Sequence, residues 1–159
     1  MDAWTDFSTV AAGASAALIG LLVVALSINL RQVVGSDRLP ARAVLALLLL
    51  VVPLFAALLQ LVPQSATAFG IELLALGTVF GTWLAVLARP GARDPAQPFA
   101  TWVADTVVPA AVVTGATLVT GGLLVAGTSA GFYGLPVLVL GGFAGALVGT
   151  WVLLVEILR

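Results

Sequence analysis

The sequence contains no cysteine and no histidine. Disulfide bonds, thiol nucleophiles, zinc sites and imidazole acid–base chemistry are therefore excluded. Charged residues make up only 8% of the chain, all the basic ones are arginine, and the formal net charge is −1. The chain therefore has no basic surface that would bind nucleic acid. It also has too few charges to cover a soluble domain of this length.

Long apolar stretches take the place of charge. Of the 159 residues, 62% are hydrophobic, and repeated apolar runs of about 18 residues or more are the signal of transmembrane helices. The stretches run from about 7 to 30, 43 to 62, 69 to 88, 99 to 127 and 135 to 158. A helix of about 20 residues is roughly 30 Å long and crosses the hydrocarbon core. We therefore predict one all-α membrane domain over residues 1–159, with five transmembrane helices.

The arginines predict how this bundle is oriented. Arg31, Arg38 and Arg42 lie between the first two stretches, Arg89 and Arg93 lie between the third and fourth, and Arg159 ends the chain. The links 63–68 and 128–134 contain no basic residue. The positive-inside rule then places the N-terminus outside and the C-terminus in the cytoplasm. Aromatic belts agree with this, with Trp4, Phe7, Phe69, Phe132 and Tyr133 at the outer boundary and Phe99 and Trp102 at the inner one.

Two prolines lie inside predicted helices. Pro53 and Pro109 have no N–H, so the carbonyls of Leu49 and Asp105 lose their helical donors. We expect a kink at each proline that the neighbouring helices accommodate.

Glycines recur every fourth residue in the last stretch, at Gly141, Gly145 and Gly149. This spacing lines one helix face with small residues and allows another backbone to approach closely. The face either packs around the axis of a homo-oligomer or packs on another helix of the same chain, for instance on Gly77 and Gly81.

A second stripe of small or polar residues follows the first stretch. Its members alternate spacings of four and three, and they are Gly13, Ala17, Gly20, Val24 and Ser27, followed by Arg31. Such a seam is typical of helix packing. The same stripe is also suited to line a narrow path with Arg31 at its cytoplasmic mouth.

The fourth stretch carries hydroxyls at Thr106, Thr114, Thr117 and Thr120, within an arc of about 120°. A hydroxyl-lined track suits partly hydrated ions or small polar solutes. Alternatively, each hydroxyl bonds the carbonyl four residues earlier, that of Val113 for Thr117, and faces protein.

Charges within a membrane are costly and are candidates for function. Asp105 and Glu72 are the acidic candidates, and we expect them at opposite ends of the bundle, each in the first turn of its helix at the membrane boundary. They therefore cannot form a carboxylate pair. The chain has neither a phosphate-binding loop nor the groups for serine, cysteine or aspartate catalysis, so we predict no enzyme, no metal and no cofactor.

Two segments carry a family resemblance. AAGASAALIGLLVVALSINLRQVV at 11–34 and IELLALG at 71–77 resemble small multi-spanning actinobacterial membrane proteins of no settled function. Some members carry the label of modulators of the FtsH membrane protease. The resemblance implies a bacterial inner-membrane location and a regulatory role, and it transfers no site residue.

These patterns lead to three functional hypotheses. The first is a homo-oligomeric pore or channel for ions or small polar solutes, surrounded by membrane lipids. The second is a non-catalytic scaffold or regulator that binds another membrane protein, for example a membrane protease, through its glycine-rich faces. The third is a proton-coupled carrier that uses Asp105.

Overall fold

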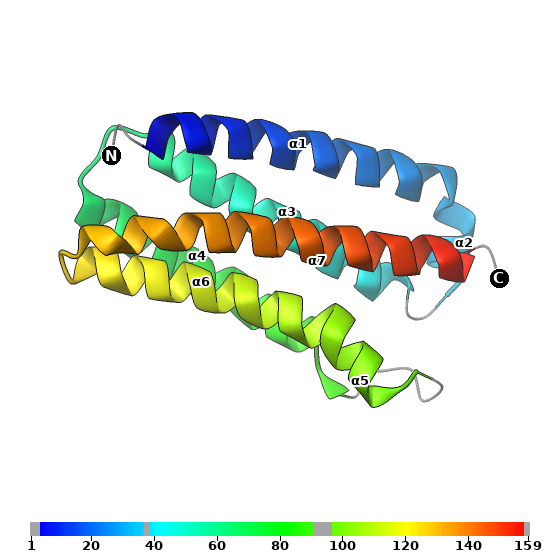
Figure 1. Cartoon of the computed structure of the whole chain (residues 1–159). Helices are drawn as coiled ribbons and strands as arrows, with labels where there is room; N and C mark the ends of the chain where they lie inside the picture. The colour runs from blue at the N-terminus through cyan, green and yellow to red at the C-terminus, as the bar shows by residue number, and fades with distance from the viewer. Residues whose placement is uncertain (1–3, 37–38, 91–96, 158–159) are drawn as a thin grey trace.

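The protein is a bundle of long helices (Figure 1). The computed structural model describes residues 4–36, 39–90 and 97–157, and within these ranges it contains no β-strand. Five helices are long and apolar enough to cross a membrane: Thr5–Ile28, Leu39–Leu61, Ala66–Leu87, Phe99–Val125 and Ser129–Leu153. The predicted all-α fold is confirmed, and each of the five predicted spans corresponds to a helix that is long and apolar enough to cross a membrane.

Several spans contain more than one element. The first is α1 (Thr5–Ile28), continued after Asn29 by the short α2 (Leu30–Val34). The second and third are α3 (Leu39–Leu61) and α4 (Ala66–Leu87). The fourth joins α5 (Phe99–Trp102), a π-helical turn (Val103–Val107) and α6 (Val108–Val125). The fifth is a 3₁₀ turn (Ser129–Tyr133) followed by α7 (Gly134–Ile157). The predicted end of the last helix, at residue 158, lies outside the described residues.

Local sequence explains several of the helix ends. The Ser65 hydroxyl caps α4 by accepting a hydrogen bond from the Ala68 amide at 3.1 Å, which satisfies one of the free donors of the first turn. Gly127 has a φ of 77° just after α6, and glycine adopts this left-handed conformation without steric cost.

The prolines affect the two helices differently. α3 continues through the buried Pro53 without interruption. In the fourth span, the π-helical turn ends at Val107, two residues before Pro109, and the Val108 amide donates to the carbonyl of Val103, five residues earlier. The wider turn changes the helix register next to the residue that has no donor.

The helices pack in an order that differs from their order in the chain. α4 packs mainly against α6, α1 against α3, and α7 against both α3 and α6. A Cβ added to Gly70 of α4 would lie 2.9 Å from the Gly121 carbonyl oxygen of α6, and one added to Gly121 would lie 2.8 Å from that of Gly70. These backbones are therefore nearly in contact, as small-residue packing in membranes allows.

The helices also differ in how much of each is covered. In α3, 56% of its most hydropathic 18-residue window is buried, whereas in α1 the value is 17%, the lowest of the five. α3 is therefore the centre of the bundle, and α1 lies at its edge (Figure 1).

The aromatic residues that the sequence predicts at the two boundaries group at the two ends of the bundle, whereas others, such as Phe55 and Phe80, lie within the spans. At one end the Trp4 ring stacks on Phe132 and Phe132 stacks on Phe69, with ring centroids 6.3 and 6.2 Å apart. At the other end Phe99 and Trp102 are 5.5 Å apart. The described arginines, Arg31, Arg42 and Arg89, lie at the end with Phe99. The remaining arginines, Arg38, Arg93 and Arg159, lie outside the described residues.

Candidate functional site

The glycine ladder of α7 makes its contacts inside the chain. A Cβ added to Gly145 would meet the ring of Pro109 in α6 and would lie 3.2 Å from a methyl carbon of Leu49 in α3. A Cβ on Gly141 would lie 2.7 Å from the Cγ1 of Val112. Both glycines thus allow α7 to sit close to its neighbours within the monomer.

The ladder becomes looser toward the C-terminal end of α7. A Cβ on Gly149 would meet only Ala46 of α3, at 3.9 Å. Gly142, which is not part of the ladder, is closely packed: an added Cβ would meet the Leu49 carbonyl oxygen and lie 2.7 Å from the Cγ of Pro53. The face toward α3 therefore includes a glycine that the four-residue spacing does not identify.

The suggested partner of this ladder was wrong. Gly77 and Gly81 face α6 rather than α7. A Cβ on Gly77 would lie 2.8 Å from the Cδ2 of Leu118, and one on Gly81 would meet the Cγ2 of Thr114. The two glycine-rich faces thus serve separate helix pairs.

The threonines of the fourth span are largely enclosed. Thr117 is fully buried and donates to the Val113 carbonyl at 2.7 Å, which is the alternative given for it from the sequence. Thr120 is 1% exposed, has no hydrogen-bond partner and packs against Gly134 of α7. Thr114 packs on α4. These hydroxyls lie between helices of the same chain.

α1 binds α3 through a face that the sequence analysis did not identify. Ser8, Ala11, Ser15 and Leu22 are the buried residues of α1. The Ser8 hydroxyl donates to the side-chain carbonyl of Gln60, and both residues are buried. The available signal was Gln60 itself, because an amide inside an apolar helix requires a partner.

The small-residue stripe of α1 faces away from the bundle. At about 100° per residue it lies on the side of the helix opposite Ser15. A Cβ added to Gly13 or Gly20 would meet nothing within 4 Å, and Val24 is 57% exposed. Ala17 and Ser27 are also exposed, as is Arg31 in α2.

Asp105 lies in the π-helical turn and is 8% exposed. Its carboxylate accepts hydrogen bonds from the Gln97 amide and the Thr106 hydroxyl, both at 2.9 Å. The Gln97 side-chain oxygen in turn accepts from Arg42 of α3 at 2.8 Å. The expectation that Asp105 occupies the first turn was wrong, because the helix already begins at Phe99. The amide of Gln97 instead connects this acid to a base on another span.

Glu72 lies near the start of α4, at the end of the bundle opposite Asp105 as expected. Its carboxylate accepts from the Gln64 amide at 2.7 Å. Because α4 begins at Ala66, Glu72 lies beyond the first turn, and the prediction that it occupies that turn was wrong. In the described part of the chain, no group of three or more acidic side chains gathers that could hold a metal ion.

Comparisons of the chain with protein families, with curated proteins and with solved structures find no match. The resemblance of 11–34 and 71–77 to an actinobacterial membrane family therefore stays a prediction.

Proposed function

We propose that the protein is a non-catalytic membrane scaffold or regulator that binds a transmembrane helix of another membrane protein through the outward face of α1. We define this α1 face by Gly13, Ala17, Gly20, Val24 and Ser27. One observation carries the proposal: these residues are exposed, and the positions at Gly13 and Gly20 have open space beside them.

The physics of helix association in lipid supports this choice. Lipid tails are as apolar as leucine, so helices associate through close contact and interhelical hydrogen bonds rather than through the hydrophobic effect. A face of small residues offers such contact, and the α7 ladder already uses it within the chain. The α1 face also consists mainly of small residues, and nothing in the chain packs beside Gly13 or Gly20.

A homo-oligomeric pore is our second proposal. Three helix faces were candidates to line such a pore: the threonine face of the fourth span, the glycine ladder of α7 and the α1 face. The first two are occupied within the monomer, since Thr117 is fully buried and Gly145 packs on Pro109. The α1 face is the one that remains. Copies arranged with this face around an axis would line the path with small groups and the Ser27 hydroxyl.

Cysteine crosslinking tests both proposals, because the natural chain has no cysteine. Ala17→Cys introduces a single thiol on the α1 face, and Ala75→Cys places a matched control on the exposed side of α4. In native membranes, a scaffold gives an adduct of Ala17→Cys with a different protein, whereas a pore gives a crosslinked dimer of the chain, the largest product that one thiol per chain allows. Equal adducts from both variants, or no adduct from either, would contradict both proposals.

A further inference from the structure

Polar side chains link α3 to the start of the fourth span. Arg42 of α3 donates to the side-chain oxygen of Gln97 at 2.8 Å, and the Gln97 amide donates to the Oδ2 of Asp105 at 2.9 Å. The Thr106 hydroxyl donates to the other carboxylate oxygen, Oδ1, also at 2.9 Å. We call the chain from Arg42 through Gln97 to Asp105 the Gln97 bridge.

The guanidinium of Arg42 fixes the direction of this bridge. Arginine stays charged and offers donors only. The amide of Gln97 therefore has to present its oxygen to Arg42 and its NH₂ group to Asp105. Because that NH₂ group only donates, the bridge is complete only while the Oδ2 of Asp105 accepts.

The two oxygens of Asp105 respond differently to a proton. A hydroxyl both donates and accepts, so Thr106 can turn to accept from a protonated Oδ1 and direct its own hydrogen to a carbonyl of the preceding turn. The Gln97 amide has no such freedom, so the proton binds at Oδ1. Oδ2 then still accepts from Gln97 but without the negative charge, and charge-assisted hydrogen bonds are roughly twice as strong as neutral ones. Protonation therefore weakens the Gln97 bridge.

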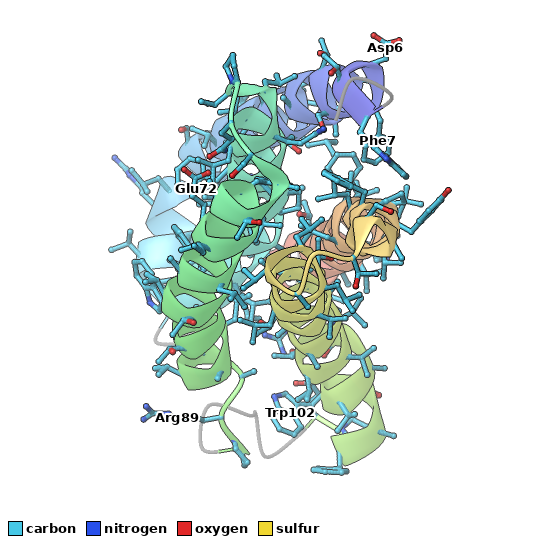
Figure 2. All side chains as sticks on the ribbon, turned by 90° about the vertical axis from the view of Figure 1, so that its left-hand side faces the viewer. Asp6, Phe7, Glu72, Arg89 and Trp102 are labelled. Atoms are coloured by element: carbon cyan, nitrogen blue, oxygen red, sulfur yellow. The ribbon has the colours of Figure 1, made fainter. Side chains whose placement is uncertain are left out.

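Few described charges surround Asp105. α5 and α6 contain no titratable residue, and α3 contributes Arg42 through the bridge. Arg89 follows α4, and Figure 2 shows its side chain on the side of α4 away from the fourth span. Other charged residues of the links and of the C-terminal end have side chains outside the part that the structure describes, and they are Asp37, Arg38, Arg93, Asp94, Glu156 and Arg159.

We propose that Asp105 is a proton-sensitive switch between α3 and the fourth span. Ionised, it holds the π-helical turn to α3 through the Gln97 bridge. When a proton from the predicted cytoplasmic side binds at Oδ1, the bridge weakens and the turn becomes more mobile. The carboxyl is 8% exposed at this end of the span, so it is shielded but not sealed from water. The switch is independent of the α1 face and of the function proposed for it.

The test is hydrogen exchange of the backbone amides in 99–107, measured on the full chain in detergent at about pH 7 and about pH 3.5, between which carboxyls take up a proton. Each rate is compared with the intrinsic exchange rate at the same pH, so that only protection is scored. In the unmodified protein, protection should fall about fivefold on acidification, the difference between a charge-assisted and a neutral hydrogen bond. Asp105→Asn, which has the shape of the protonated acid, should show the lower protection at both pH values.

Two further variants complete the experiment. Glu72→Gln removes a carboxylate at the opposite end of α4 from Arg89 (Figure 2) and should keep the pH dependence. Gln97→Ala removes the bridge itself, so its protection should be low and independent of pH; it decides the question if Asp105→Asn does not fold. The proposal is overturned if the unmodified protein is equally protected at both pH values, or if Asp105→Asn or Gln97→Ala loses protection on acidification as the unmodified protein does.

Discussion

Single side chains decide how closely the helices of this bundle approach. Gly145 lies against the ring of Pro109, and Ser8 bonds Gln60 at the interface of α1 and α3. The four-residue spacing identified Gly145 as a contact position, but spacing alone did not reveal which helix it meets. Gln60 was missed because sequence shows an amide but not the hydroxyl that faces it.

Gly145→Leu should destabilise the monomer. The added side chain has to displace the Pro109 ring and Leu49, and overpacking of this kind typically costs about 1–3 kcal/mol. Unfolding in detergent, followed by circular dichroism, measures the loss. Gly13→Leu is the control, because nothing lies within 4 Å of a Cβ there. Equal stability of the two variants would show that α7 does not pack on α6 at this position.

Ser8→Ala should weaken the attachment of α1. It removes the hydrogen bond that the buried Gln60 accepts from Ser8, and hydrogen bonds between membrane helices contribute about 0.6 kcal/mol on average, with a maximum of about 1.7. A double-mutant cycle with Gln60→Leu isolates the pair. Thr9→Ala is the control, because the exposed Thr9 hydroxyl bonds the Thr5 carbonyl of its own helix at 2.9 Å. A coupling energy of zero would rule out the bond.

At the scale of elements, hydropathy and length located all five spans, because the bilayer requires a long apolar helix at each crossing. They did not reveal which face of a helix is covered. Both faces of α1 are largely apolar, so either could contact lipid. The sequence therefore does not distinguish the buried side, with Ser8 and Ser15, from the open side, with Gly13 and Gly20. The π-helical turn was also missed, since Pro109 indicates a lost donor but not how the helix compensates.

Gln97→Ala should loosen the start of the fourth span. It removes the amide that accepts from Arg42 and donates to Asp105, so the π-helical turn loses this hydrogen-bonded link to α3. Hydrogen exchange of the backbone amides in 99–107 should become about 5–10-fold faster. A factor of this size is expected when local opening becomes easier by about the net free energy of one hydrogen bond. Gln64→Ala, which removes the partner of Glu72 at the opposite end, should leave these amides unchanged. Unchanged exchange in Gln97→Ala would show that this network does not hold the turn.

At the scale of the molecule, an odd number of spans places the start of α1 and the end of α7 at opposite ends of the bundle (Figure 1). Which end faces the cytoplasm is predicted from the arginines alone. The order of packing was beyond sequence reasoning, because the pairing of α4 with α6 depends on contacts such as Gly70 with Gly121, between residues far apart in the chain.

Thiol labelling in intact cells tests the orientation. Ser129→Cys lies in the 3₁₀ turn before α7 and should react with a membrane-impermeant maleimide from outside. Gly35→Cys follows α2, beside the arginine-containing link, and should react only after the membrane is permeabilised. Both positions are exposed, so the reverse pattern would place the N-terminus in the cytoplasm.

The pairing of α4 with α6 has a consequence for biogenesis. When α4 enters the bilayer, the helix that covers Gly70, Gly77 and Gly81 has not yet followed it, because α6 comes later in the chain. Lipid or an insertion factor has to shield this glycine face until the fourth span arrives. α1 and α3, by contrast, are consecutive spans that pack on each other, so they can form a hairpin as soon as both are inserted. The interface between α4 and α6 therefore cannot form before the fourth span is inserted, whereas the interface between α1 and α3 can.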